Sequence, residues 1–327
     1  MQTLFNTVQN YPVKGVFRIA RDTKTQIDVV EAHIGRGGLT GRGECRPYAR
    51  YDETPDSVIS QIETIRPQIE SGAQRSALQD LLPAGAARNA LDCAFWDLEA
   101  KAADRPVWTL AGLPPPQPLR TAFTLSLDTP EAMAKAAKSA AQYKVLKIKI
   151  GRKDGLDCAK AIMTARPDAE LIVDANEALD PNELSVFRHE LRDWPVLLIE
   201  QPVRAGYIDA FNNPDALPIL CADEALHEQS DLARLWAQGY RAVNIKLDKC
   251  GGLTAGICLM REAKDMGFVT MAGCMVGSSL AMAPMFLLAQ LADIVDLDGP
   301  ALLSRDINHG LKYKKDLVFP PSPELWG

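Results

Sequence analysis

Two lysines in one apolar run are the first residues whose spacing suggests chemistry. The run, VLKIKIG from Val145 to Gly151, is typical of a buried β-strand and carries Lys147 and Lys149. Because alternate residues of a strand point to the same face, both ammonium groups would lie in one confined space and need acidic partners. An edge strand with solvated lysines is the simpler alternative. The residues that follow favour the first interpretation, because they supply acids at regular intervals.

Charged residues end the next apolar runs of the chain. Asp174 closes LIVD, Glu200 closes LLIE, Asp223 follows LCA, and Lys246 closes VNIK. In a barrel, the carboxyl ends of the strands share one rim, where active sites are built. Any one acid could instead cap a following helix, but three in succession would repel one another unless a divalent cation neutralised them. Oxygen ligands favour a hard ion, so we predict one Mg²⁺ per active site, bound by Asp174, Glu200 and Asp223.

The lysines suggest proton transfer next to this metal. Lys149 and Lys246 would approach a metal-bound carboxylate substrate from opposite faces. One lysine would take the α-proton while the metal stabilises the enediolate, and the other would return a proton and invert the centre. A lysine base must be partly neutral, and we expect the metal and Lys147 to lower its pKa.

Composition limits the class of protein that could carry this site. A chain of 327 residues suits a barrel of about 250 residues with a smaller companion. The 36 basic and 42 acidic residues give a formal charge of −6, which argues against nucleic acid as the main partner. We find neither a signal peptide nor an apolar stretch long enough to span a membrane, and the seven cysteines lack metal-type spacing. We therefore expect a cytoplasmic protein with reduced cysteines and no membrane partner.

The pattern of predicted secondary structure changes near a proline cluster at 114–118. Before it, β-type runs with glycine turns give way to helical patterns, including a strong amphipathic helix over 86–103 with Leu91, Phe95 and Leu98 on one face. We predict an α+β capping domain at 1–115, a (β/α) barrel catalytic domain at 116–300, and a C-terminal segment at 301–327 that returns to the cap.

Strands and helices alternate after the boundary. The expected strands lie at 119–125, 145–150, 171–174, 196–200, 219–223, 242–246, 269–273 and 294–297. Helices are expected to begin at Thr129-Pro130 and Asp180-Pro181, where a capping residue precedes proline. Eight such units predict a TIM-type barrel. An open doubly wound sheet would be expected to show a glycine-rich phosphate motif after its first strand, and none is present.

These motifs resemble the enolase superfamily, and within it the dipeptide epimerases, most closely the L-Ala-D/L-Glu epimerases. The resemblance covers nearly the whole chain and implies an α/β fold with a modified (β/α)8 barrel, (β/α)7β, under an α+β cap. It rests on Lys147-Ile148-Lys149, Asp174-Ala175-Asn176, Glu200-Gln201-Pro202, Ala222-Asp223-Glu224, Asn244 to Lys249, Asp296-Leu297-Asp298-Gly299-Pro300 and the cap stretch 83–92.

The resemblance also implies how a dipeptide is recognised. In the epimerases the acidic motif after the eighth strand holds the free α-amino group of the dipeptide, which points to Asp298 with Asp296 beside it. A cap arginine binds the acidic side chain at the other end. Arg21 in the first cap loop is favoured for this role, with Arg18 and Arg50 as rivals.

The remaining expected site residues support these contacts. Thr124 and Lys147 are expected to touch substrate, and Asn176 and Asp248 to support the ligands from behind. No histidine stands in the seventh-strand run 271–275, so a histidine and lysine pair of the mandelate racemase kind is not available.

The implied function is Mg²⁺-dependent epimerisation of L-Ala-D-Glu and L-Ala-L-Glu by 1,1-proton transfer at the α-carbon of the C-terminal residue, in murein peptide metabolism. The implied partner is a small dipeptide, and homo-oligomers are common in the superfamily. One alternative is an N-acylamino acid racemase, a cycloisomerase or an o-succinylbenzoate synthase, whose substrates leave Asp298 without an ammonium. Another class is a non-catalytic, metal-dependent peptide-binding protein, but binding alone needs neither lysine base.

Overall fold

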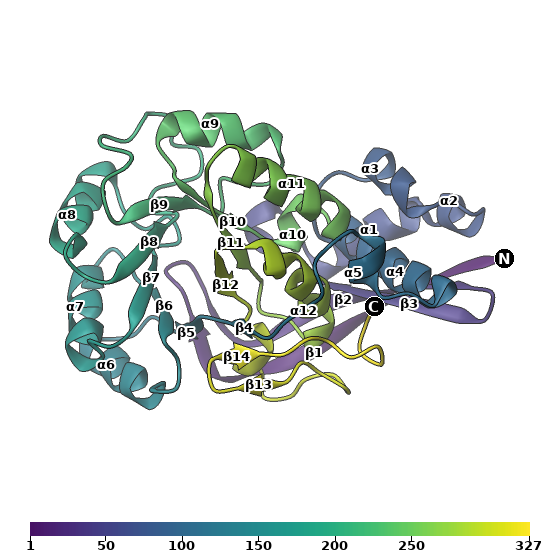
Figure 1. The fold of residues 1–327 in the computed structure, drawn as a ribbon, viewed down its shortest axis with the longest axis horizontal. Coiled ribbons are helices and arrows are strands. Elements are labelled where there is room, and N and C mark those ends of the chain that lie inside the picture. The colour runs from purple at the N-terminus through teal and green to yellow at the C-terminus, as the bar shows by residue number, and fades with distance from the viewer.

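Eight parallel strands form the barrel in the computed structural model, which describes residues 1–327, and their order follows the chain. The strands are β5 (Phe123–Leu125), β6 (Val145–Lys149), β7 (Glu170–Asp174), β8 (Val196–Glu200), β9 (Ile219–Ala222), β10 (Ala242–Ile245), β11 (Val269–Gly273) and β12 (Ile294–Asp296). A backbone hydrogen bond of 2.8 Å from Ala122 N to Val295 O links the two ends of the sheet. The eight ranges expected from the sequence all overlap these strands, and the predicted barrel is confirmed (Figure 1).

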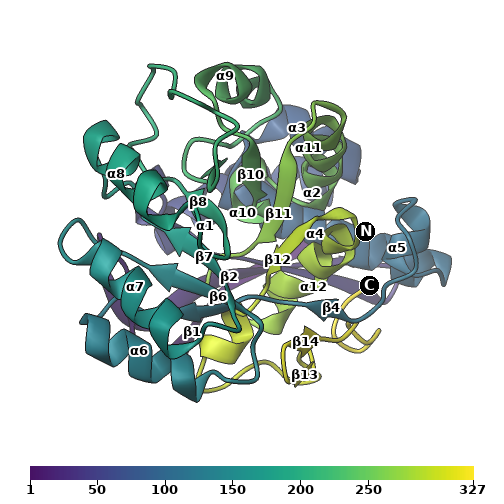
Figure 2. The ribbon, with the colours of Figure 1, turned by 60° about the vertical axis from the view of Figure 1, so that its left-hand side comes forward.

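Helices cover the outer side of the barrel, as Figure 2 shows for α6, α7 and α8. They are α6 (Pro130–Ser139), α7 (Gly155–Ala165), α8 (Pro181–Leu191), α9 (Ser230–Gln238), α10 (Leu247–Cys250), α11 (Leu253–Asp265) and α12 (Ser279–Leu288), which continues into η3 (Ala289–Leu291). The side chains of Thr129 and Asp180 accept backbone hydrogen bonds at the starts of α6 and α8, as expected from the sequence. No helix follows β8, so the barrel is a modified one.

The cap consists of an antiparallel sheet and short helices. The sheet pairs β1 (Gln2–Arg18), β2 (Thr23–Arg36) and β3 (Leu39–Cys45) in chain order. The helical elements are η1 (Ala49–Tyr51), α1 (Pro55–Thr64), α2 (Arg66–Glu70), η2 (Arg75–Ala77), α3 (Leu78–Leu81), α4 (Ala86–Ala103) and α5 (Val107–Leu110). The β1–β2 hairpin extends to the barrel, where Leu127 N, just after β5, donates to Arg18 O at 3.0 Å (Figure 1). The hairpin turn therefore lies at the carboxyl-terminal rim.

Helix α4 spans the predicted residues but is not amphipathic. Almost all of it is buried, including polar Arg88, Asn89 and Asp92. One side packs on β3 and β2 of the cap, and the other meets α10 and α11 of the barrel. The polar residues bond across this boundary: Arg88 donates to the backbone oxygens of Cys250 and Gly251. The sequence pattern was misleading because these polar groups face the barrel rather than solvent.

The C-terminal residues run from the barrel back to the cap. After η4 (Gly299–Leu302), β13 (Tyr313–Lys314) pairs with β14 (Leu317–Val318), and β14 pairs with β4 (Leu119–Arg120). Trp326 is fully buried and donates through Nε1 to Arg42 O and Cys93 O in the cap. None of the helices has both the length and the apolar character needed to cross a bilayer.

Glu44 links the cap to the barrel and makes stability depend on pH. Its carboxyl group is buried between β3 and the start of α12, where the backbone N and hydroxyl of Ser278 donate to it. Burial raises the pKa of Glu44 from 4.5 to about 8, although the bonds from Ser278 oppose the shift. Between these two values the unfolded chain releases this proton and the folded chain keeps it. The contribution of Glu44 to stability is therefore complete below pH 4.5 and is lost as pH rises through 8.

We expect Glu44→Gln to flatten this dependence, because the amide imitates the protonated carboxyl group. The fall in melting temperature between pH 5 and pH 9 should be smaller in the variant than in wild type. Thermal unfolding followed by circular dichroism measures it, with exposed Glu228→Gln as the matched control. Identical slopes in wild type and Glu44→Gln would contradict the assignment.

Candidate active site

Lys147 and Lys149 both lie in the barrel mouth, as their spacing on β6 predicts. They are 2% and 7% exposed. The strand register places Lys149 beside Asp174 of β7, and Asp174 beside Glu200 of β8. Lys149 Nζ donates to Asp174 Oδ2 at 2.5 Å. The adjacent strand ends therefore bring base and acids together without any help from the loops.

Lys147 is the counter-ion of three carboxylates. Its ammonium nitrogen lies 2.8 Å from Glu200 Oε2, 2.8 Å from Asp296 Oδ2 and 3.3 Å from Asp174 Oδ2. Burial lowers the pKa of Lys147, but Asp296, Glu200 and Asp174 outweigh burial and raise it well above its ordinary value. This lysine is therefore a fixed positive charge.

Asp223 is held by two lysines from the loop after β10. Lys246 Nζ donates to Oδ2 at 2.7 Å, and Lys249 Nζ donates to Oδ1 at 2.5 Å. Burial raises the pKa of Asp223, but Lys246 and Lys249 outweigh burial and bring it well below 3.8. The sequence motif Asn244 to Lys249 includes Lys249, but no role was expected for it. Its spacing of three residues from Lys246, on a short helix, is the pattern that could have predicted a second lysine beside Asp223.

The expected lowering of the lysine pKa does not hold for Lys246 in this structure. Burial and the ammonium of Lys147 do lower its pKa, but Asp223, Glu200 and Glu224 outweigh them, so the pKa rises. The expectation counted the metal ion and the neighbouring ammonium and omitted the closer carboxylates. The part of it that depends on the bound metal ion stays a prediction.

The three carboxylates predicted as metal ligands lie around the same lysines. No three acidic, histidine or cysteine side chains are already arranged to hold a metal ion, because ammonium groups lie between the carboxylates. The donor chemistry nevertheless suits a hard cation. Glu200 Oε2 is buried and lies 2.8 Å from the ammonium of Lys147, while Asn244 Nδ2 donates to Oε1 at 2.8 Å. Burial and the charge of Asp174 raise the pKa of Glu200 to about 7, and the ammonium of Lys147 offsets only part of this rise.

The two residues expected behind the ligands behave differently. Asn176 lies in the site: its backbone N donates to Asp174 Oδ1 at 3.0 Å, and its amide donates to Glu224 Oε1 at 3.2 Å. Asp248 faces the cap instead, where Oδ1 accepts from Arg46 N and Asn89 Nδ2, both at 2.9 Å. Asp248 therefore couples the segment that carries Lys246 to the cap, through bonds that involve none of the three acids.

The acidic pair at the end of β12 is fully enclosed. Asp296 Oδ2 pairs with Lys147, whereas its Oδ1 is buried and accepts no hydrogen bond. Asp298 Oδ2 accepts from the backbone N of Thr124 at 2.6 Å. Burial, followed by repulsion from Asp296, raises the pKa of Asp298 to about 7. This pair is therefore short of positive charge.

The predicted cap arginine is already well bonded. Arg21 Nη1 donates to Asn176 O at 2.8 Å and Glu177 Oε2 at 2.7 Å, and Nη2 donates to Glu224 Oε1 at 2.6 Å and Tyr48 Oη at 3.5 Å. Its rivals lie further out: Arg50 forms two 2.9 Å bonds to Glu177, and Arg18 is exposed.

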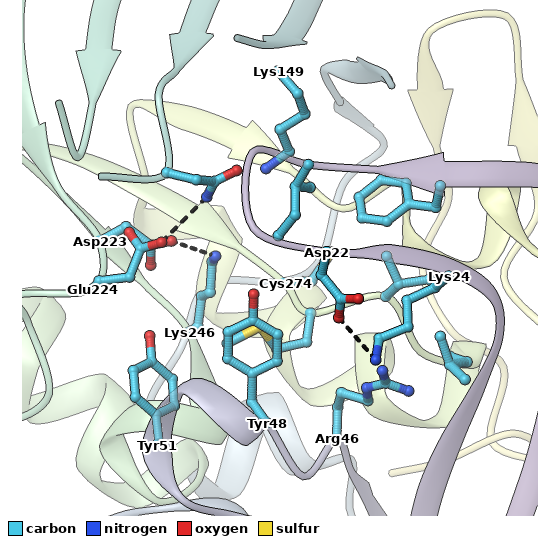
Figure 3. Close-up of a pocket in the computed structure, with 16 residues that line it drawn as sticks. Asp22, Lys24, Arg46, Tyr48, Tyr51, Lys149, Asp223, Glu224, Lys246 and Cys274 are labelled. Atoms are coloured by element: carbon cyan, nitrogen blue, oxygen red, sulfur yellow. Dashed lines mark hydrogen bonds and ion pairs between the residues drawn. The ribbon is translucent and has the colours of Figure 1, made fainter. Parts of the chain in front are cut away.

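A pocket runs from Lys149 and Lys246 toward the cap loops (Figure 3). Lys149, Lys246, Asp223 and Glu224 lie at one end, and Lys24 and Arg46 lie at the other, with Tyr48 between them. The full lining is Phe17, Ile19, Asp22, Lys24, Ile27, Arg46, Tyr48, Tyr51, Lys149, Asn176, Asp223, Glu224, Lys246, Cys274, Met275 and Val276.

Family comparisons match both parts of the chain. Residues 1–112 match the mandelate racemase / muconate lactonizing enzyme N-terminal domain, and residues 131–309 match the enolase C-terminal domain-like family. The chain belongs to the enolase superfamily. This enolase-superfamily member thus carries its carboxylates and lysines at the barrel rim, beneath the matching cap.

Individual relatives narrow the class to epimerases and racemases of amino acid derivatives. The L-Ala-D/L-Glu epimerase of Escherichia coli (strain K12) is 41% identical over 318 residues, covering 96% of this chain and 98% of the relative. The N-acetyl-D-glutamate racemase of Pseudoalteromonas sp is 43% identical over 289 residues, covering 88% and 91%. A crystal structure of an enolase family member from Agrobacterium tumefaciens with homology to dipeptide epimerases, holding sodium and L-Ala-L-Glu, superposes with a TM-score of 0.95, at 42% identity and full coverage of both chains. The enzyme is an isomerase of the dipeptide epimerase group.

Proposed function

We propose that this enzyme interconverts L-Ala-D-Glu and L-Ala-L-Glu by 1,1-proton transfer at the α-carbon of the glutamate. Lys149 and Lys246 come from β6 and from the end of β10, and both point into the pocket (Figure 3). An α-carbon held between them would lose its proton to one lysine and receive a proton from the other. Lys147 stays charged and holds the surrounding carboxylates in place.

Asp174, Glu200 and Asp223 would hold a Mg²⁺ ion. When bound, the ion supplies positive charge beside the substrate carboxylate and so makes the α-proton more acidic. Asn244 and Lys249 position two of these ligands from behind, through the bonds to Glu200 and Asp223. Such supporting hydrogen bonds orient metal ligands, and their loss typically lowers metal affinity or activity by about ten-fold to a hundred-fold.

The unpartnered oxygen of Asp296 is the observation that carries the dipeptide assignment. A buried carboxylate oxygen without a donor is costly, and an ammonium group arriving beside Asp298 would satisfy it. A dipeptide brings such a group, and an N-acylated amino acid does not.

We place this activity in the cytoplasm, in murein peptide metabolism. The seven cysteines form no disulfide, and five of them are buried, which supports a reducing compartment. The activity itself is tested by incubating L-Ala-L-Glu with the enzyme and Mg²⁺ in deuterated water. One deuterium should enter at the glutamate α-carbon as L-Ala-D-Glu forms, and a binding protein without catalysis would introduce none.

Asp298→Asn should strongly reduce turnover of L-Ala-L-Glu. Leaving a desolvated ammonium without its charged partner costs about 2–5 kcal/mol, or on the order of thirty-fold to several-thousand-fold in kcat/KM. N-acetyl-L-glutamate brings no ammonium, so its turnover should change far less. Steady-state kinetics of both substrates with both proteins provides the comparison. Faster wild-type turnover of N-acetyl-L-glutamate, together with unchanged dipeptide turnover in the variant, would replace this proposal with N-acylamino acid racemisation.

A further inference from the structure

The cap end of the catalytic pocket carries a guanidinium group that has no acidic partner. Two cations line this end, Lys24 and Arg46 (Figure 3). Lys24 pairs with Asp22 at 2.8 Å, and both side chains are well exposed. Arg46 forms no ion pair, and its guanidinium makes one hydrogen bond, from Nη1 to the backbone oxygen of Asp28 at 3.0 Å. Most of its five donors are therefore available to an anion.

The surroundings of Arg46 give it a fixed position and leave its charge only partly compensated. Its backbone N donates to Asp248 Oδ1, and Asp248 lies two residues after the catalytic Lys246. This bond ties the backbone of Arg46 to the catalytic loop, and the bond from Nη1 to Asp28 O orients the guanidinium. Burial lowers the pKa of Arg46 against the attraction of Asp28 and Asp248, as expected for a guanidinium removed from water without a close counter-ion.

Arg21 is in the opposite situation. The guanidinium of Arg21 uses four of its five N–H groups in hydrogen bonds to Asn176 O, Glu177, Glu224 and Tyr48. In addition, Arg21 does not line the pocket that contains the lysines. It lines a neighbouring hollow together with Arg50 and Glu177. These bonds tie the first cap loop to the loops after β7 and β9, a structural task that leaves little capacity for a substrate carboxylate.

We propose that Arg46 binds the side-chain carboxylate of the glutamate in the dipeptide, and that Arg21 is a positioning residue that holds the cap loop over the barrel. This assignment rests on the proposed function. It follows from the direction of the pocket, which leads from the two lysines at the α-carbon to Arg46. A planar guanidinium with free donors can bind a carboxylate through two parallel hydrogen bonds.

The test compares L-Ala-L-Glu with L-Ala-L-Gln, which has nearly the same shape and no side-chain charge. Arg46→Gln should lower kcat/KM for L-Ala-L-Glu by about ten-fold to a hundred-fold, mainly through KM, because a hydrogen-bonded charge pair is lost. The value for L-Ala-L-Gln should change by less than about three-fold. Arg46→Lys should recover part of the preference for glutamate. Arg105→Gln, at an exposed cap arginine just after α4, is the matched control and should leave kcat/KM for both substrates unchanged.

Arg21→Gln should lower kcat/KM for both dipeptides by similar factors, because a displaced cap loop affects the binding of every dipeptide. Equal losses for both substrates in Arg46→Gln would overturn the assignment, since a merely structural role gives that result. If Arg21→Gln loses the preference for L-Ala-L-Glu over L-Ala-L-Gln and Arg46→Gln keeps it, Arg21 binds the glutamate side chain instead. Wild-type enzyme that epimerises neither dipeptide would overturn the proposed function itself, and the assignment with it.

Discussion

Asp174→Asn, Glu200→Gln and Asp223→Asn should each lower Mg²⁺-dependent epimerisation by more than about a thousand-fold. Loss of one preorganised electrostatic contact in an active site already costs about a hundred-fold to a thousand-fold, and a metal ligand affects both cation binding and substrate orientation. Each change removes a charge with almost no change in volume. The barrel should therefore keep its fold, which depends on the apolar faces of β5 to β12 rather than on these acids.

Deuterium exchange into L-Ala-L-Glu measures the activity, and circular dichroism with thermal unfolding measures the fold. Exposed Asp209→Asn is a matched control and should retain wild-type activity. Full wild-type activity after thorough chelation would rule out the metal-dependent mechanism. Loss of the folded state in the three variants would show instead that the acids mainly neutralise Lys147, Lys149 and Lys246.

Lys149→Ala and Lys246→Ala should each stop epimerisation, because inversion needs a proton donor and an acceptor on opposite faces. The expected loss is about a hundred-fold to ten-thousand-fold, the usual range for a general acid or base. Each variant keeps one lysine and should still exchange the α-proton of one epimer. The two variants should differ in which epimer exchanges.

Proton NMR in deuterated water, starting separately from L-Ala-L-Glu and L-Ala-D-Glu, distinguishes the two faces. Half-buried Lys160→Ala serves as the control, since its ammonium pairs with Glu190 on the outer side of the barrel. Equal residual exchange of both epimers in either single variant would refute the two-base assignment.

The strands and helix starts could be predicted because they follow from patterns within a few neighbouring residues. Short apolar runs separated by helical segments identified all eight barrel strands, and Thr129 and Asp180 marked helix starts because a cap requires only nearby backbone. The acids and lysines at strand ends could be placed at one rim because parallel strands in a barrel end on the same side. Helix α4 was located correctly but its exposure was not, since exposure depends on what packs against both sides.

The amino-acid sequence by itself determined the barrel, the cap, and the group of charged residues at the barrel mouth. Only the tertiary structure decided how those charges pair. Four findings depend on distances between segments far apart in the chain. Lys249 donates to Asp223, Asp248 faces the cap, and neighbouring carboxylates raise the pKa of Lys246. The donors of Arg21 are occupied, whereas most donors of Arg46 are free. The physical reason is that strand periodicity repeats within a few residues, whereas electrostatic energies vary with separations of a few ångströms that loop conformation and packing set.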